Sequence, residues 1–336
     1  AALKFFFFTV VGSLLMLAGM IALRLYAGSF EYGALQSAVF AGKVPAGVLT
    51  FAFLGFAAAF AVKTPLFPFH TWLPDAYAAC PAAGVVMLSG AMAKLGTYGF
   101  LRFGVQLFPE ESARFAPVLM ALATVGIVYA ALVAAVQKDV KRVIAYSSVS
   151  HLGYVVLGIF SGSAVASSGA ALQMVNHGIT TGALFLIVGL LEDRCGTLRI
   201  DRLGGLWQTT PVLGRVFLIA TLSSVALPLT NGFVGEFLIL LGAFQTSPVM
   251  AAVAATGAVW SAVYMLWMFQ RVVYGAPRER TRVADLNTVE RVVLGSLVVL
   301  IFAIGIVPSP FLKMIESSLT TAPRLGASAG GVGVQP

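Results

Sequence analysis

The sequence has little charge and few cysteines. Only 10% of its 336 residues are Asp, Glu, Lys or Arg, whereas 59% are hydrophobic. One water-soluble core cannot bury that much apolar surface, so soluble globular classes are excluded. Cys80 and Cys195 lack Cys-x-x-Cys spacing, so they indicate inert thiols, with neither a metal site nor an iron–sulfur cluster. The glycine fingerprint of dinucleotide-binding folds and any flavin signature are also absent.

Apolar residues gather in runs long enough to cross a bilayer, which takes roughly 17 to 25 residues each. These runs lie at residues 4–26, 46–64, 81–107, 113–137, 139–160, 164–191, 211–246, 249–273 and 287–308. The predicted fold class is therefore an all-α integral membrane protein with about nine transmembrane helices. The chain opens with AALKFFFF, without methionine or a signal peptide, and we expect a truncated N-terminus.

Basic residues account for the formal charge of +8, and they fall in alternate loops. The three basic loops contain Lys138, Lys141 and Arg142; Arg194, Arg199 and Arg202; and Arg271, Arg278, Arg280 and Arg282. The loops near 161–164 and 247–248 contain no Lys or Arg. This bias predicts cytoplasmic basic loops, with Lys4 inside and the C-terminus outside. No aromatic-interleaved basic patch indicates nucleic acid as a partner.

Two apolar runs are interrupted where a helix must break. KTPLFPFHTWLP contains Pro65, Pro68 and Pro74, and SVALPLTNGFVGEF contains Pro228 and Gly232. Without a break, residues 211–246 would form a rod of roughly 50 Å, longer than a bilayer core of about 30 Å. Backbone groups freed in lipid must be satisfied by protein or by a wet cavity. The breaks therefore predict a polar interior.

The interrupted runs are the second and the seventh, and their odd separation makes them cross the membrane in opposite directions. This predicts an inverted repeat of about five helices, with a site near the midplane. The predicted transmembrane domain covers 1–310. It comprises the end of a first repeat at 1–107, a second repeat at 113–273 and a final helix at 287–308. Residues 311–336 are expected to form a short interfacial turn and a loose tail.

Three ionisable residues lie inside these runs. Lys94, in GAMAKLGTYGF, has roughly 20 Å of helix on each side, and a charge at that depth costs about 2.5–3.5 kcal/mol. Lys63 precedes the first break, and Glu236 follows Gly232. Structural alternatives remain open for each: Lys94 could pair with a carboxylate, and Lys63 or Glu236 could cap a half-helix.

We interpret these three residues as proton-exchanging groups, since burial brings amines and carboxylic acids toward neutral pKa values whereas arginine does not deprotonate. His151 and His177 could connect them by a water chain, with Ser147, Ser148, Ser150, Thr180 and Thr181 around them. Each histidine could instead be a satisfied core residue or a helix–helix hydrogen-bonding group. His70, near Trp72 and Asp75, is expected to be structural. Asp139, Lys141 and Arg142 are expected at a solvated loop edge.

Four segments resemble the antiporter-like membrane subunits of respiratory complex I: KTPLFPFHTWLPDAYAACPAAGVVMLSGAMAKLGTYGFLRF, VQKDVKRVIAYSSVSHLGYV, LQMVNHGITTGALFLIVGLL and LPLTNGFVGEFLIL. The resemblance implies a fold of about fourteen helices, of which this chain would hold the sixth to the last. It makes Lys63 the lysine of the first broken helix, Lys94 the central lysine, and His151 and His177 the connecting histidines. Glu236 becomes the carboxylate of the second broken helix. A glutamate partner of Lys63 would lie upstream of Ala1.

The resemblance also implies proton translocation coupled to quinone reduction in partner subunits. The partners would be the antiporter-like subunits L and N on either side, protons, internal water and membrane lipid. NADH and quinone would act only through partner subunits, and this chain would hold no cofactor, metal or redox site. The location would be an energy-transducing membrane, such as the bacterial inner membrane. The alternatives are a subunit of a multisubunit cation/proton antiporter or membrane-bound hydrogenase, and a non-transporting membrane scaffold.

Overall fold

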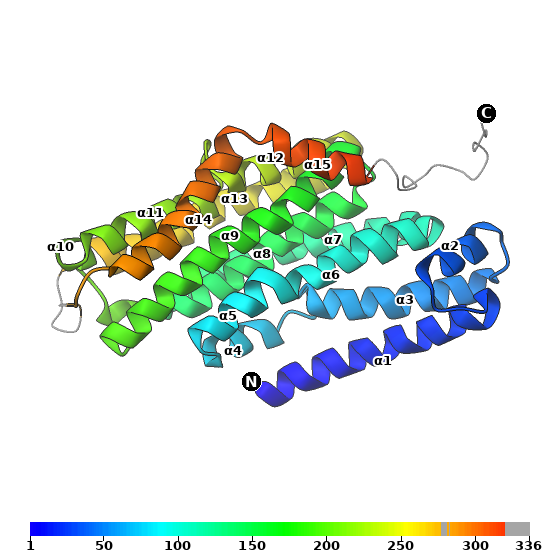
Figure 1. Ribbon diagram of the computed structural model, residues 1–336, viewed down its shortest axis with the longest axis horizontal. Coiled ribbons are helices and arrows are strands. Elements are labelled where there is room, and N and C mark those ends of the chain that lie inside the picture. Colours follow the sequence, from blue (N-terminus) through cyan, green and yellow to red (C-terminus); the bar gives the residue numbers. More distant parts are fainter. Residues whose placement is uncertain (277–280, 282, 320–336) are drawn as a thin grey trace.

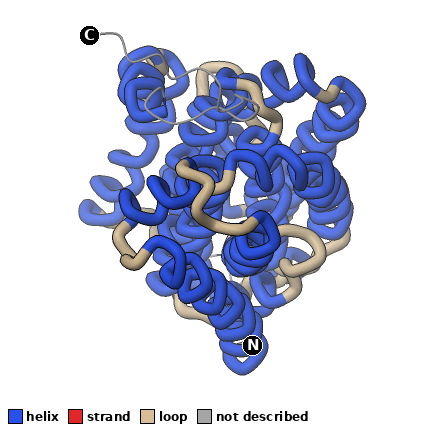
Figure 2. Tube along the Cα trace, turned by 90° about the vertical axis from the view of Figure 1, so that its right-hand side faces the viewer, coloured by secondary structure: helices blue, strands red, loops and turns tan. Residues whose placement is uncertain are grey.

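The computed structural model describes residues 1–276, 281 and 283–319. Within these ranges every regular element is a helix, and Figure 1 shows the long helices running side by side along one direction. Turned by 90°, the same bundle is seen end-on with loops joining the helices (Figure 2). Among the described residues, eight helices are long and apolar enough to cross a membrane. The prediction of an all-α, multi-pass integral membrane protein is confirmed.

The continuous crossings match seven of the predicted runs closely, and an eighth run is a composite. The seven are α1 (Ala2–Ala27), α3 (Ala46–Lys63), α7 (Pro109–Ala135), α8 (Val140–Phe160), α9 (Ala164–Cys195), α13 (Pro248–Phe269) and α14 (Thr288–Ile306). α8 lies at the centre, with 94% of its most apolar stretch buried, against 17% for α1 and for α14. Side chains on α8 and on its neighbour α9 are therefore best placed to avoid lipid.

The composite crossing carries Lys94 and contains two π-helical segments. It runs through α5 (Ala82–Met87), η1 (Leu88–Met92), α6 (Ala93–Gly99) and η2 (Phe100–Val105). π segments widen the helix and free a carbonyl from its regular bond. Here Lys94 turns back and donates to the carbonyl of Ser89, which lies within η1. The widened turn thus fixes the direction of the lysine side chain.

The first break separates α3 from the short helix α4 (Trp72–Ala79). α3 ends at Lys63, and the indole Nε1 of Trp72 donates to the freed carbonyl of Val62 at 2.9 Å. His70, in the connecting turn, packs between the rings of Phe67 and Tyr129 at 5.7 and 5.3 Å. This contact fits the structural role expected for His70.

The second break divides the run 211–246 into α11 (Pro211–Ser224) and α12 (Asn231–Thr246). Between them Ala226 and Leu229 adopt positive φ angles of 56° and 76°, a conformation that costs about 1–2 kcal/mol for a residue with a side chain. The N-terminal end of α11 is capped by a residue far along the sequence: Asp285 accepts from the backbone N–H groups of Val212 and Leu213 at 2.8 and 3.0 Å. The predicted discontinuity of this crossing is present.

Charged residues tie several helix ends together at one end of the bundle. Lys4 pairs with Asp75 at 2.9 Å, and Arg142 pairs with the same carboxylate at 3.1 Å. Arg194, at the end of α9, pairs with Glu290 of α14 at 2.6 Å. Lys4 thus lies at the same end as two of the basic loops, as predicted. Arg278, Arg280 and Arg282 of the third basic loop lie outside the described residues.

The expectation of a solvated edge at Asp139, Lys141 and Arg142 is wrong for Lys141, whereas the side chain of Arg142 is 39% exposed. Asp139 caps α8 by accepting from the N–H of Arg142 at 3.1 Å. Lys141 is only 3% exposed and pairs with Glu192 at 2.9 Å while donating to the carbonyl of Cys80 at 2.8 Å. The Lys141 stem is thus buried between the first turn of α8 and the last turn of α9, whereas Glu192 remains 44% exposed, and Lys141 links α8 to α9 and to the end of α4.

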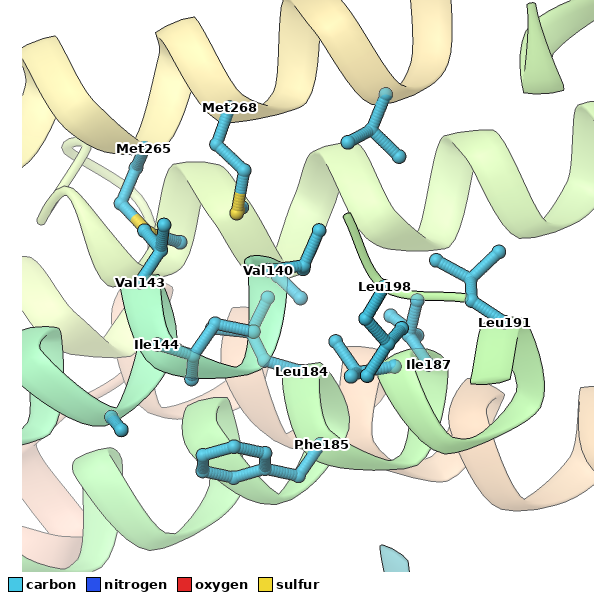
Figure 3. Close-up of a cluster of buried hydrophobic side chains, with 14 of the residues drawn as sticks. Val140, Val143, Ile144, Leu184, Phe185, Ile187, Leu191, Leu198, Met265 and Met268 are labelled. Atoms are coloured by element: carbon cyan, nitrogen blue, oxygen red, sulfur yellow. The ribbon is translucent and has the colours of Figure 1, made fainter. Parts of the chain in front are cut away.

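An apolar core near Lys141 joins α8, α9 and α13. Figure 3 shows Phe185 and Leu184 of α9, Val143 and Ile144 of α8, and Met265 and Met268 of α13 in one group. All these side chains are at most 1% exposed. The group holds α8 and α9 together below the polar site described next.

Some short helices were not predicted. α2 (Tyr32–Phe40) follows α1, and η3 (Ile200–Arg202) and α10 (Leu206–Thr209) precede α11. The expected interfacial turn after residue 310 is instead α15 (Ser309–Leu319), a helix of eleven residues. The rest of the predicted tail, 320–336, lies outside the described residues.

Candidate functional site

Four of the five predicted site residues meet at the second break, each on a different helix. They are Lys94 on α6, His151 on α8, His177 on α9 and Glu236 on α12. Their exposed fractions are 9%, 5%, 4% and 4% in that order. Buried ionisable side chains are costly in a membrane and mark functional sites by default. The helix pairing therefore brings four buried ionisable side chains together in one place.

Lys94 and His177 are in direct contact. The Nζ atom of Lys94 lies 2.6 Å from Nδ1 of His177 and also donates to the Ser89 carbonyl. Gly178 faces Gly90 across this contact, and a methyl group added to Gly178 would stand 3.1 Å from the Gly90 carbonyl. Because both positions are glycine, α9 can approach η1 closely enough for the lysine to reach the histidine.

His151 lies between His177 and Glu236. The two imidazole centroids are 5.9 Å apart, and Nε2 of His151 is 3.3 Å from Oε1 of Glu236. The same nitrogen is 2.8 Å from the carbonyl of Ser224, the last residue of α11. On the other side of the ring, Nδ1 is 2.7 Å from the carbonyl of Ser147. The break therefore supplies His151 with a freed carbonyl that an intact helix would have used itself.

An amide network, which the sequence reasoning missed, surrounds Glu236. Gln173 donates to Oε1 of Glu236 at 3.2 Å. Asn176 and Asn231 donate to each other's backbone carbonyls at 2.7 and 3.2 Å, and Oδ1 of Asn231 accepts from Ser223 at 2.6 Å. The available signal was the helical spacing of Gln173, Asn176 and Thr180, which puts three polar side chains on the α9 face that carries His177.

Gly235 explains why this network fits. A methyl group at that position would lie 3.0 Å from Cβ of Gln173 and 3.1 Å from Nδ2 of Asn176. The absence of this methyl group lets α12 lie against α9, because small residues allow helix backbones to approach closely in membrane bundles. The sequence GFVGEF thus combines a helix start, a close approach and the carboxylate.

A small cavity of about 10 Å³ lies among these groups, lined by His151, Gln173, Asn176, His177, Thr180, Thr181, Ser223, Ser224, Gly232 and Glu236. This is about the space one water molecule needs. Two buried atoms that belong to its lining residues, Nε2 of His177 and Oδ1 of Asn176, have no hydrogen-bond partner among the residues that the structure describes. A water molecule in this space would lie beside both histidines and Glu236, which line it.

Lys63 is not part of this cluster. It is partly buried and lines an open pocket of about 470 Å³ with Phe5, Thr9, Val10, Ser13, Leu14, Trp72, Met92 and Leu95. Among the described residues no hydrogen bond or ion pair involves its amine. Its neighbours Met92 and Leu95 flank Lys94 in sequence, so the pocket lies on another face of the helix that holds Lys94.

The surroundings of Lys94 and Glu236 bear on the structural roles that the sequence left open for them. No carboxylate lies within 4 Å of the Lys94 amine in the described part of the chain, so Lys94 does not lock helices as half of an ion pair. Glu236 lies beyond the first turn of α12 and faces His151 and Gln173, so it is not a helix cap. Within the same residues no group of His, Cys, Asp and Glu could hold a metal ion.

The chain was compared with known proteins. The family model described as NADH:quinone oxidoreductase/Mrp antiporter, TM matches residues 1–261. NADH-quinone oxidoreductase subunit M of Rhodobacter capsulatus is 42% identical over 330 residues, which cover 95% of this chain and 64% of that protein. The chain therefore spans slightly less than two thirds of that relative's length.

Solved structures agree. A chain of respiratory complex I from Thermus thermophilus with bound NADH has a TM-score of 0.86 at 38% identity, covering 95% of this chain and 68% of that chain. A chain of an archaeal membrane-bound sulfane sulfur reductase has a TM-score of 0.84 at 28% identity, covering 94% and 64%. The chain is a member of the NADH:quinone oxidoreductase/Mrp antiporter transmembrane family.

Proposed function

We propose that this chain is a proton-translocating membrane-arm subunit of NADH:quinone oxidoreductase, respiratory complex I, of the type called subunit M. The observation that carries the proposal is the buried polar line from Lys94 through His177 and His151 to Glu236. The similarity to subunit M of Rhodobacter capsulatus over 95% of this chain supports it. Membrane proton relays use such chains of Lys, His and acidic residues.

The first proton step runs between Lys94 and His177. Their 2.6 Å contact is within the reach that proton transfer between side chains requires. When Nδ1 of His177 takes a proton from Lys94, the proton on Nε2 can leave toward the cavity, because the two ring nitrogens act on opposite sides. A water in the cavity then passes it toward Glu236, which lines the same space.

Lys63 acts as the remote end of the line. Its charge would alter the protonation of Lys94 by Coulomb repulsion, and an acidic group approaching the open pocket would relieve that repulsion. We assign the end of a first repeat to 1–107, the second repeat to 113–273 and the final helix to 287–308, so the Lys94–Glu236 line lies mostly within the second repeat. Glu236 is the terminal exchange group.

Electron transfer takes place in other chains under this proposal. This chain binds no cofactor, and NADH and quinone react in partner subunits, whose reduction of quinone drives the proton steps. Antiporter-like subunits L and N lie on either side, in an energy-transducing membrane such as the bacterial inner membrane. Oxidoreductase activity therefore belongs to the assembly.

A second candidate is a subunit of a multisubunit cation/proton antiporter or membrane-bound hydrogenase. The description of the family model also names the Mrp antiporter, which favours keeping this candidate, although the 42% identity with subunit M of Rhodobacter capsulatus favours complex I. The subunits that purify with the full-length protein decide between the two. Flavin- and cluster-bearing NADH dehydrogenase subunits support complex I, and their absence supports the alternative.

Replacing Lys94 with Met tests proton translocation in the assembled complex. Methionine keeps most of the side-chain volume but cannot exchange a proton, so proton pumping and quinone reduction should both fall sharply while the complex still assembles. Lys138→Met is the matched control, because Lys138 is exposed in a loop. Normal pumping by the Lys94→Met complex would favour a membrane scaffold over a transporter.

A further inference from the structure

The two buried histidines have opposite sets of partners. Nδ1 of His177 faces the amine of Lys94, which is a donor, at 2.6 Å. Both ring nitrogens of His151 instead face acceptors: Nδ1 is 2.7 Å from the Ser147 carbonyl, and Nε2 is 2.8 Å from the Ser224 carbonyl. Glu236 adds a carboxylate oxygen 3.3 Å from Nε2. A charged Lys94 amine can only donate, so His177 then accepts, whereas His151 is placed to donate twice.

These hydrogen-bond contacts indicate whether each imidazole ring is neutral or charged. A carbonyl oxygen can only accept, and a neutral imidazole has a single N–H. If His151 were neutral, one of its two short carbonyl contacts would bring lone pairs together. The hydroxyl of Ser147, 3.2 Å from Nδ1, could donate to a neutral ring, but the carbonyl contact at 2.7 Å would remain unpaired. An imidazolium satisfies both carbonyls at once.

His177 fits the neutral form. Its Nδ1 accepts from Lys94, so its proton is on Nε2, next to the cavity. A second positive charge on this ring would stand 2.6 Å from a lysine amine without any carboxylate beside it in the described residues. The same geometry that favours a charge on His151 therefore opposes one on His177.

The surroundings of His151 stabilise a lasting charge. Glu236 lies in ion-pair contact, and Gln173 donates to the same carboxylate oxygen at 3.2 Å. Buried ion pairs are stable only where further hydrogen bonds satisfy the remaining donors and acceptors, and here two carbonyls and an amide do so. The ionisable groups that face the ring are Glu236 from α12 and His177 from α9; α11 contributes the Ser224 carbonyl, which also accepts from Ser261 of α13 at 3.4 Å.

We propose that His151 is a permanently protonated positioning residue that holds Glu236 in place as a carboxylate, and that His177 alone passes protons from Lys94. The path through His177 rests on the proposed function, whereas the charge on His151 rests on its own hydrogen bonds. In this scheme the proton crosses the cavity directly from His177 to Glu236. The positive charge beside Glu236 favours release of that proton, because it stabilises the ionised carboxylate.

Nitrogen-15 NMR of the assembled complex, labelled at histidine, tests the charge. Protonated and unprotonated ring nitrogens give separate signals, and the difference between wild type and His151→Gln isolates His151. We expect only protonated-nitrogen signals in this difference near neutral pH. The wild type minus His177→Gln difference is the internal reference and should contain one unprotonated nitrogen. An unprotonated signal from His151 would overturn the proposal.

Substitution by arginine tests the role, since arginine keeps a positive charge but cannot exchange protons. We expect His151→Arg to pump more than His151→Gln, whereas His177→Arg should lose about 10²-fold in proton transfer. Arginine at 151 no better than glutamine, in complexes that assemble normally, would contradict a fixed-charge role. A neutral His151 in a complex whose Lys94→Met variant fails to pump would end this inference and leave the proposed function standing.

Discussion

The hydrogen-bonding groups freed at the two helix breaks find their partners in different ways. At the first break Trp72 satisfies a freed carbonyl, and Lys63 lines a mostly apolar pocket of about 470 Å³. At the second break Asn231, Asn176 and Ser223 satisfy one another around a cavity of about 10 Å³. α1 covers the first break and is largely exposed, whereas the buried α8 and α9 cover the second. A break alone therefore does not make a proton site; polar neighbours on buried helices do.

The largest effect is expected at the carboxylate of the second break. Glu236→Gln keeps the shape of the side chain but removes its exchangeable proton, so proton translocation by reconstituted complex should fall by about 10²-fold or more. Glu110→Gln, at an exposed position of α7, is the control and should pump normally. Full pumping by Glu236→Gln would mean that the second break, like the first, is a structural joint.

The next prediction compares how much a substitution at each break changes the stability of the subunit. Asn231→Leu removes the amide that donates to the Asn176 carbonyl and the Oδ1 that accepts from Ser223 and Thr180. The loss should destabilise the subunit by about 3 kcal/mol, since each unpaired buried group costs about 1–3 kcal/mol. Thr64→Val at the first break should not destabilise the subunit, because no described residue bonds the buried Thr64 hydroxyl and burying an unpaired hydroxyl is itself costly. Thermal unfolding of the detergent-solubilised complex measures both. Equal shifts of the unfolding midpoint in the two variants would contradict the proposed difference between the breaks.

The next prediction concerns the close approach of helices at the second break. Gly235→Ala puts a methyl group against Gln173 and Asn176, and such overpacking costs about 1–3 kcal/mol. Gly47→Ala in α3, where nothing lies within 4 Å, should cause no loss, because alanine favours helix. The same unfolding measurement should show a lower midpoint for the first variant only. An unshifted midpoint for Gly235→Ala would show that α9 and α12 can separate freely.

The smallest effect concerns pH at the first break. Hydrogen bonds from Lys4, and then the Arg142 charge, hold the pKa of Asp75 below its ordinary value. Its contribution to stability is therefore fully present above the unfolded value of about 3.9 and is lost as the pH falls through the lower folded pKa. Asp75→Asn should cost only about 0.5 kcal/mol and should flatten this acid dependence. An unchanged acid limb in an unfolding titration would show that the ion pairs contribute nothing.

Much of this comparison could be predicted from the sequence. Proline and glycine located both breaks, and the rarity of charge in apolar runs singled out Lys63, Lys94 and Glu236. The partners of each residue could not be predicted, because they depend on how helices cross. From the sequence alone Lys141 resembles a loop residue, yet it is buried where the first turn of α8 meets the last turn of α9.

The amide network escaped prediction for a related reason. Gln173 and Asn176 are uncharged polar residues, and the glycine-permitted approach of α12 gives them partners. The π segments around Lys94 have no local signature either, since they arise from packing strain within an otherwise helical run. Local pattern thus identified the residues, and tertiary packing determined their connections.

The central claim is that protons travel along the Lys94–His177–Glu236 line through the small cavity. The most direct test is a high-resolution density map of the intact assembly during turnover. We predict ordered water in the cavity, within hydrogen-bond distance of Nε2 of His177 and joined to Glu236. A dry, tightly packed cavity in every turnover state would contradict the account.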